Sequence, residues 1–363
     1  MKERIYLQGL NSIRFWAALF VIIWHIEQFK AVFSIMTDYR DSFVLSQVVM
    51  SGDNAVVLFF VLSGFLITYL MLIEIEQTDT VNIRKFYIRR FLRIWPLYYL
   101  LVIIGFLIVP AFIQASRFGD IMFDFRQSRN YLATLGLYIV FLPNVGLALD
   151  FVPLGISPLW SVGVEEHFYL IWAPLIKRAR RYVLPTIIGV IVFRFIIGIL
   201  VDMGFVVSPL MTVTSETVPQ FIVGVLNLFR FEAMAIGGLL AYILYHRVSF
   251  WLNLIYHPVT MTGISAVMVG QMLFHGIFDA YNSQISFIVM SLLYGIFIMN
   301  VATNPRYPFK LENRVYRHLG KLSYGMYMYH STVIIVIIIL LDGAGFNDDN
   351  FVYNCVLYIL SIS

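Results

Sequence analysis

Charged residues and cysteine are both scarce in this chain of 363 residues. Charged residues make up 13% of the sequence, about half of the share found in soluble domains, which excludes a soluble globule. The single cysteine, Cys355, excludes an intrachain disulfide framework and a metal site built from several cysteines. Apolar residues make up 60%. The composition indicates an all-α, multi-pass integral membrane helical bundle, with residues 1–363 forming one membrane-embedded domain and no soluble domain.

Apolar runs of about 18 to 25 residues recur along the chain, and each can cross a bilayer core about 30 Å thick. We expect spans at 10–33, 54–75, 91–113, 131–149, 182–201, 219–245, 259–278, 285–302, 322–341 and 351–363. As a helix, the last run is shorter than the bilayer core, so we expect the chain to be truncated there. The first run lacks a small-residue cleavage site, so we expect a retained helix rather than a signal peptide.

Lysine and arginine residues predict the orientation of the bundle. They cluster at 82–93, 177–181 and 304–321, which places these segments and both termini in the cytoplasm. Cytoplasmic ends at both 93 and 177 require an even number of crossings, yet three candidate segments lie between them. The segment near 158–176 is the most polar, so we expect a partially inserted helix there beside about ten transmembrane helices. Because the basic residues lie beside apolar runs, the net charge of +4 does not indicate nucleic-acid binding.

Arg14 and His25 lie inside the first apolar run. Eleven helical steps of about 100° come within roughly 20° of three full turns, so both side chains share one face, about 16 Å apart along the axis. The structural alternative is an arginine that reaches the membrane surface and a histidine satisfied by a hydrogen bond. Ionisable groups inside a membrane are costly, so the pair favours a functional role.

Three further polar groups lie in other spans. Arg90 and Arg93 begin the third span at i, i+3 spacing and could clamp phosphates, although anchoring at the membrane surface explains them as well. The segment 323–330 ends in His330. Arg230 and Glu232 are a candidate buried ion pair, and both this pair and His330 have a structural alternative.

The segment 160–172 combines carboxylates with aromatic residues. Glu165 and Tyr169 share a helical face with other aromatic side chains, and Trp160 and Glu166 lie in the same segment. A carboxylate on an aromatic face could orient a histidine, accept a proton or bind a sugar hydroxyl. The alternative is an interfacial belt of aromatic residues with hydrated carboxylates.

Five motifs in chain order resemble the membrane acyltransferase-3 family, whose members O-acylate glycans and similar acceptors from acyl-CoA. The motifs are Leu10-Asn-Ser-Ile-Arg14 with His25, Phe60-Val-Leu-Ser-Gly-Phe65, Arg90-Phe-Leu-Arg93 with Ile94-Trp-Pro96, Trp160 to Tyr169, and Ser323 to His330. The resemblance covers essentially the whole chain. Four positions depart from the family pattern, where Asp, Ser, Gln and Asp are usual: Asn11, Gly163, His167 and Glu232.

The resemblance implies that acyl-CoA enters from the cytoplasm and that the acceptor approaches from outside. On this hypothesis His25 is the general base, because an imidazole is mostly neutral at pH 7, and Glu165 orients His25 or the acceptor. The donor would be held by Arg14, Arg90 and Arg93. The acceptor would be bound by Glu166, Tyr169, Trp160 and His330. Acetyl-CoA is then a donor substrate, and we expect no permanently bound cofactor and no metal.

The expected partners are acyl-CoA, a carbohydrate or lipid-linked glycan acceptor, the lipid bilayer and glycan-assembly proteins, in a bacterial inner membrane. A transporter or flippase for a lipid-linked glycan or hydrophobic solute is the main alternative. A non-catalytic scaffold that partners a glycan polymerase is a third. The sequence leaves open the acceptor, the acyl group, and whether transfer is direct or passes through an acylated histidine or serine.

Overall fold

The computed structural model describes residues 7, 9–35, 43–120, 131–149, 152–204, 224–226, 229–274, 283–308, 313–346 and 351–362. Over these residues the secondary structure is helical and contains no strand, which confirms the all-α class. The two chain ends, residues 1–6 and 363, lie outside the described residues, so the predicted cytoplasmic position of both termini stays a prediction.

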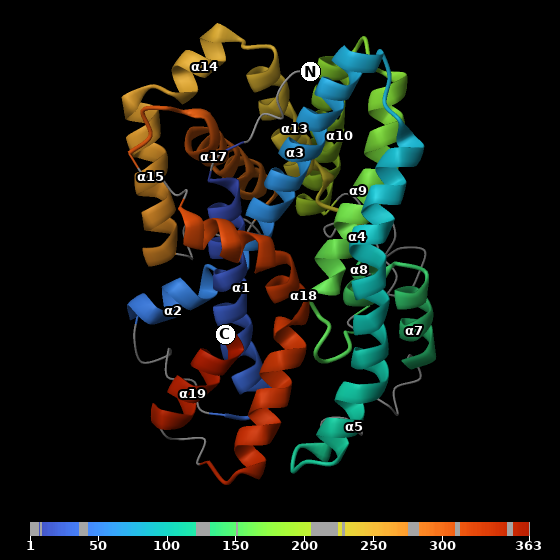
Figure 1. The fold of residues 1–363 in the computed structure, drawn as a ribbon, viewed down its shortest axis with the longest axis vertical. Helices are drawn as coiled ribbons and strands as arrows, with labels where there is room; N and C mark the ends of the chain where they lie inside the picture. Colours follow the sequence, from blue (N-terminus) through green and yellow to red (C-terminus); the bar gives the residue numbers. More distant parts are fainter. Residues whose placement is uncertain are drawn as a thin grey trace.

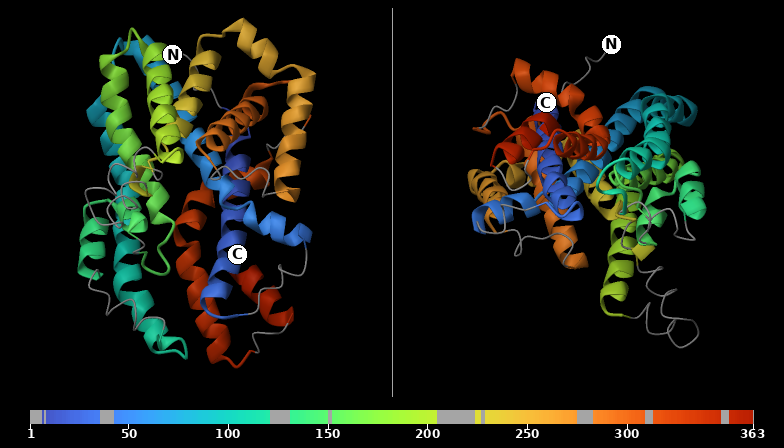
Figure 2. Two further views of the ribbon diagram at one scale, coloured as in Figure 1. Left: turned by 180° about the vertical axis from the view of Figure 1, so that it is seen from behind. Right: turned by 90° about the horizontal axis from the view of Figure 1, so that it is seen from below.

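The helices are, in chain order, α1 (Leu10–Val32), α2 (Phe43–Met50), α3 (Asn54–Thr78), α4 (Ile83–Ile103), the π-helix η2 (Ile104–Ile108), α5 (Val109–Gln114), α7 (Tyr131–Ile139), α8 (Pro143–Ala148), α9 (Leu159–Arg178), α10 (Val183–Asp202), α13 (Phe231–Tyr245), α14 (Ser249–Ile255), α15 (Pro258–Leu273), α17 (Gln284–Thr303), α18 (Arg314–Gly343) and α19 (Phe351–Ile362). Helices α4, α9 and α10 stand on one side of the bundle and α14, α15 and α17 on the other, with α1 and α3 between them (Figures 1 and 2).

In the described part of the chain, seven helical segments are long and apolar enough to cross a membrane. An eighth counts if α14 and α15, which meet at a bend of 53°, form one span. A helix satisfies its own backbone polar groups, which the bilayer core requires. The protein is therefore a multi-pass membrane protein, while the predicted number of about ten spans stays a prediction.

The expected span at 131–149 is wrong. This run forms two short helices, α7 and α8, of nine and six residues, and nine helical residues rise only about 14 Å. Pro143 begins α8, and a proline cannot continue the hydrogen-bond ladder of a preceding helix. The polar helix α9, in contrast, is continuous for 20 residues, or roughly 30 Å. Its partial insertion stays a prediction.

Helices α3 and α13 cross in direct backbone contact. A Cβ atom added at Gly64 would overlap the carbonyl oxygen of Met234, and one added at Gly237 would overlap that of Val61. Both glycines are therefore needed for this close approach, as small residues commonly are where membrane helices pack. The crossing fixes α3 at the centre of the bundle.

Tyrosine hydroxyls from other helices bind backbone carbonyl groups in α9 and η2. Pro174 of α9 cannot donate to the carbonyl of Leu170, and the Tyr87 hydroxyl donates to that oxygen at 2.8 Å. In η2, the carbonyl of Phe106 accepts from the Tyr131 hydroxyl at 2.7 Å. These bonds join α4 to α9 and α7 to the π-helical segment that follows α4.

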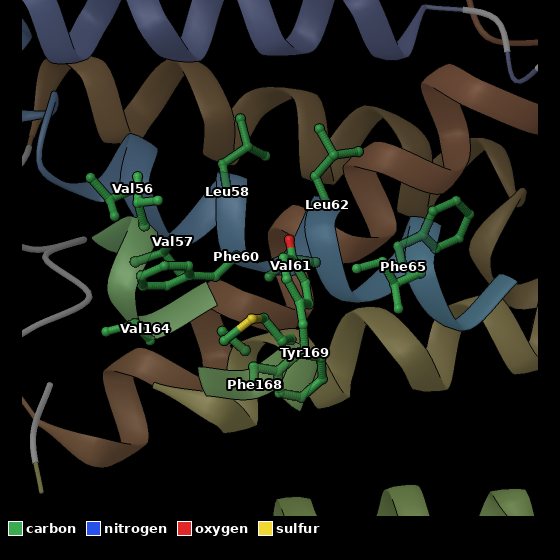
Figure 3. Close-up of a cluster of buried hydrophobic side chains, with 14 of the residues drawn as sticks. Val56, Val57, Leu58, Phe60, Val61, Leu62, Phe65, Val164, Phe168 and Tyr169 are labelled. Carbon is green, nitrogen blue, oxygen red and sulfur yellow. The ribbon is translucent and has the colours of Figure 1, made fainter. Parts of the chain in front are cut away.

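The packed core beside the site lies between α3 and α9. Apolar side chains of α3 face Val164 and Phe168 of α9 (Figure 3), and Phe60, Val61 and Phe168 are almost completely buried. Rigid packing of this kind holds the polar side chains that project from the same helices.

Candidate active site

A cavity of about 260 Å³ lies among α1, α3, α4, α9 and α18. We call it the inner cavity. Its charged lining consists of Arg14, Arg90, Arg93 and Glu165. Its hydroxyl-bearing lining consists of Ser63, Ser161, Tyr169, Ser323, Tyr324 and Tyr327. Three guanidinium groups therefore share one cavity with a single carboxylate, which makes the cavity attractive to an anionic ligand.

Aromatic rings and an amide position the three arginines. The Arg90 guanidinium lies over the Tyr169 ring, 4.9 Å from its centroid, and that of Arg93 lies 5.7 Å from the centroid of Tyr324. Arg14 donates to the Asn11 side-chain oxygen at 3.3 Å. Cation–π contacts leave the N–H edges of a guanidinium available for phosphate. The structure thus brings together the three residues predicted to hold the donor, as the i, i+3 spacing of Arg90 and Arg93 indicated.

Glu165 is bound by two hydroxyl groups. Ser63 donates to one carboxylate oxygen at 3.0 Å and Tyr169 to the other at 2.7 Å. Both donors line the inner cavity. The carboxylate therefore fixes a serine from α3 and a tyrosine from its own helix at the cavity wall.

A pair of histidines lies one helical turn beyond the inner cavity. Tyr327 lines the cavity, its hydroxyl lies 2.6 Å from that of Ser161, and its ring centroid lies 5.8 Å from that of His330. Nε2 of His330 in turn lies 3.2 Å from Nδ1 of His25. The exposed fraction is 8% for His25 and 2% for His330.

Carbonyl groups determine which nitrogen of each neutral ring carries the proton. Nδ1 of His330 lies 2.7 Å from the Tyr327 carbonyl, and a carbonyl only accepts, so Nδ1 is protonated and Nε2 has a lone pair. Nδ1 of His25 lies 2.9 Å from the carbonyl of Val21 and donates there and towards His330. Nε2 of His25 is then the unprotonated nitrogen. The geometry presents a base at this atom.

Glu165 is not the neighbour of His25. The expectation that it orients His25 is wrong, because its carboxylate binds Ser63 and Tyr169 while His330, expected in the acceptor site, occupies the position beside His25. The two residues that meet are 305 positions apart, and their contact depends on how α1 packs against α18.

Two other predicted acceptor-binding residues lie away from the inner cavity. Glu166 points to α4, where the Trp95 indole lies 3.4 Å from a carboxylate oxygen. Trp160 packs edge-on against Phe60. Neither residue lines the inner cavity, because neighbouring positions on α9 point in other directions than Glu165 and Tyr169.

Sequence reasoning missed several cavity residues. Ser63 lies in the motif 60–65, and Tyr327 lies one turn before His330; both motifs were recognised without a role for these side chains. Spacing from a predicted site residue could have found Tyr327. Ser63 had no such signal, since its contact with Glu165 joins two helices.

The candidate pair of Arg230 and Glu232 belongs to a larger buried cluster. Glu232 is 4.0 Å from Arg230 but only 3.0 Å from Arg194 of α10, and Gln284 of α17 donates to its other oxygen at 3.1 Å. The cluster joins three helices. It lies outside both the inner cavity and the vestibule described next.

A second cavity, of about 2300 Å³, opens where the ends of α3, α9 and α13 meet the beginnings of α1 and α10. We call it the vestibule. Its arginines are Arg14, Arg89, Arg180, Arg181 and Arg247. Arg14, Leu66 and Leu70 line both the vestibule and the inner cavity. Arg14 therefore marks the junction between the two.

Comparison with known proteins decides the family. A family model described as an acyltransferase domain, that of acyltransferase-3, matches residues 7–363. The chain belongs to the acyltransferase-3 family. This confirms the resemblance drawn from the five motifs, and no comparison tests the roles of individual site residues.

Three relatives show the range of similarity. An uncharacterised protein of Haemophilus influenzae is 32% identical over 243 residues, which cover 64% of this chain and 89% of the relative. O-acetyltransferase OatA of Staphylococcus aureus is 25% identical and peptidoglycan O-acetyltransferase OatA of Listeria monocytogenes 24% identical, each over 92% of this chain. The chain spans only about half of these two relatives, 51% and 50%. No solved structure matches the chain.

Proposed function

We propose that this protein transfers an acetyl group from cytoplasmic acetyl-CoA to a hydroxyl group of an extracytoplasmic glycan or glycan precursor. Membership of an acyltransferase family and the O-acetyltransferase names of the OatA relatives support the reaction class. The observation that carries the proposal is the arginine-lined inner cavity that ends one turn from the His25–His330 pair.

We expect the donor to enter from the vestibule, because basic loops such as those beside it are usually cytoplasmic. Arg14, Arg90 and Arg93 bind its diphosphate at the junction of the two cavities, with charge-assisted hydrogen bonds. The pantetheine arm has about twelve bonds between phosphate and sulfur, as many as four peptide residues, so it extends roughly 14 Å. The eleven residues from Arg14 to His25 rise about 16 Å along α1. The arm therefore brings the thioester close to the imidazole.

His25 accepts the proton of the acceptor hydroxyl at Nε2. The hydroxyl oxygen attacks the thioester carbonyl, the bond between carbon and sulfur breaks, and the proton passes from His25 to the CoA thiolate. The products are an acetyl ester and CoA. His330 is a positioning residue, because its lone pair and the Val21 carbonyl hold the His25 proton on Nδ1. Glu165 is a second positioning residue, which holds Ser63 and Tyr169 at the cavity wall.

The test uses membranes that contain the full chain, labelled acetyl-CoA and a glycan acceptor fraction. His25→Ala should lower transfer by about 10²- to 10⁴-fold, the usual contribution of a general base. His318→Ala is the matched control, because His318 is exposed on α18 and lines neither cavity. Full transfer by a folded His25→Ala protein would overturn the assignment of the base.

Transport is the competing function, and the same preparation tests it. A flippase would move a lipid-linked glycan across the membrane without consuming acetyl-CoA. Movement of the glycan with no label transferred would favour that alternative. Label in the glycan that depends on His25 would contradict it.

A further inference from the structure

The vestibule carries an excess of positive charge, of which the proposed transfer step uses only Arg14. Beside its five arginines it contains two carboxylates, Glu74 and Glu76. Glu74 accepts from the backbone N–H of Asn82 at 2.9 Å, and Glu76 accepts from the Tyr245 hydroxyl at 2.6 Å. Both carboxylates are therefore engaged by neutral donors of the protein. The five arginines outnumber the two carboxylates, so the lining carries a net positive charge.

Three arginines of the vestibule, Arg89, Arg181 and Arg247, are exposed, and Arg181 lies next to Arg180 just before the beginning of α10. Arg180 is 3.3 Å from Asp79. Its neighbour Arg181 is exposed and, among the described residues, forms no ion pair or hydrogen bond through its side chain. An exposed guanidinium in a positively charged cleft is suited to bind a phosphate dianion bidentately.

An aromatic wall lines the same cavity. The ring of Tyr245 lies 6.1 Å from that of Tyr69 and 5.1 Å from that of His246, centroid to centroid, and Tyr242 lies 4.2 Å from His246. Desolvation lowers the pKa of His246, an effect that the Glu76 carboxylate opposes. The imidazole is thus mainly neutral at pH 7 and contributes an aromatic face. Faces of this kind stack on nucleobases.

The vestibule also extends far enough from Arg14 to hold a group attached to a diphosphate there. From Leu66 at the junction to Glu76 at the outer end, ten residues of α3 rise about 15 Å. A ligand whose diphosphate lies beside Arg14 would therefore place the group attached on the vestibule side among Arg181 and the aromatic wall. In CoA that group is adenosine with a phosphate on its 3′ oxygen.

We propose that the vestibule recognises the 3′-phosphoadenosine end of CoA, with Arg181 on the 3′-phosphate and the wall of Tyr69, Tyr242, Tyr245 and His246 beside the adenine. This inference rests on the proposed function, because it assumes an acyl-CoA donor. It adds a nucleotide subsite on the vestibule side of the diphosphate, away from the reacting atoms at His25. It explains why the cavity next to the inner cavity is large, basic and aromatic.

The experiment compares acetyl-CoA with acetyl-dephospho-CoA, which lacks only the 3′-phosphate, in initial-rate assays on membranes. For the wild type, loss of the phosphate should raise KM about tenfold or more, the effect of losing a charge-assisted hydrogen bond, with kcat unchanged. Arg181→Gln should raise KM for acetyl-CoA by a similar factor and leave KM for acetyl-dephospho-CoA unchanged. Arg178→Gln is the control, since Arg178 is exposed at the end of α9, close to Arg181 in the chain, and does not line the vestibule.

The outcomes separate this inference from the proposed function. Equal KM values of the wild type for both donors would overturn the subsite and leave the acetyl-CoA reaction standing. An equal rise in KM for both donors in Arg181→Gln would overturn the role of Arg181 at the 3′-phosphate. No transfer from acetyl-CoA by the wild type would overturn the proposed donor, and the subsite with it.

Discussion

Nε2 of His330 lies 3.2 Å from Nδ1 of His25, so the helices α1 and α18 share a hydrogen-bonded imidazole pair. The Tyr327 carbonyl holds a proton on the far nitrogen of His330, which turns its near nitrogen into an acceptor. Nδ1 of His25 therefore donates to His330, and Nε2 of His25 keeps its lone pair. One backbone carbonyl on α18 thereby sets the protonation of a ring on α1.

His330→Gln should retain more activity than His330→Ala. The glutamine side chain offers a carbonyl oxygen that can accept from Nδ1 of His25, whereas alanine leaves that nitrogen with the Val21 carbonyl alone. We expect kcat to fall about 10- to 100-fold in His330→Ala, the usual effect of losing a residue that orients a functional histidine, and less in His330→Gln, with KM for acetyl-CoA unchanged in both. Equal losses in the two variants would contradict the positioning role. Tyr329→Phe, at the neighbouring and exposed position, is the control.

Glu165→Gln should lower kcat much less than His25→Ala. The amide keeps an oxygen for Tyr169 or Ser63, so the cavity wall stays in place. Removing the carboxylate charge leaves three arginines unopposed in the inner cavity, so KM for acetyl-CoA should not rise. Steady-state kinetics on the two variants in parallel provides the comparison. A kcat loss in Glu165→Gln as large as that in His25→Ala would show that the carboxylate itself takes part in proton transfer.

The helical period made part of this site predictable. Arg90 and Arg93 were expected on one face because residues three apart on a helix are neighbours, and both line the inner cavity. The class of the protein was equally accessible, since apolar runs of this length are typical of membrane-spanning helices. Predictions of this kind need only the period and the length of a single helix.

Contacts between helices were not predictable in the same way. The neighbour of His25 is His330 rather than Glu165 because α1 packs along α18. No local sequence pattern indicates which helices pack together. The broken span at 131–149 had a visible signal, however. Pro143 interrupts an otherwise apolar run, and its missing N–H outweighs the hydropathy of the residues around it.

Gly64→Ala should destabilise the fold, because its new Cβ would overlap the Met234 carbonyl on α13. Overpacking of this kind typically costs about 1–3 kcal/mol. Thermal unfolding in detergent should show a lower Tm than the wild type. Gly263→Ala is the matched control, since a Cβ there meets no atom within 4 Å, and alanine is the better helix former. The prediction fails if both variants unfold at the same temperature.

Glu232→Gln should lower the stability of the fold far more than removal of the carboxylate from an exposed ion pair. Glu232 is completely buried and its charge opposes Arg194 at 3.0 Å, so its loss leaves a buried guanidinium uncompensated, at a cost of about 3–5 kcal/mol. Asp79→Asn removes a surface pair with Arg180 and should cost about 1 kcal/mol or less. Yield of folded protein and Tm in detergent measure both. Similar losses for the two variants would contradict the buried role of Glu232.

A double-mutant cycle can test the bond between Tyr87 and the carbonyl that Pro174 leaves free. Tyr87→Phe removes the donor to Leu170 and should cost about 1 kcal/mol, the typical net value of a hydrogen bond. Pro174→Ala restores a backbone N–H that can reach the same oxygen within α9. In that background Tyr87→Phe should cost almost nothing, so the two substitutions should couple by nearly the full cost of Tyr87→Phe alone. If the costs of the two substitutions were strictly additive, the Tyr87 hydroxyl would not act by satisfying the carbonyl of Leu170.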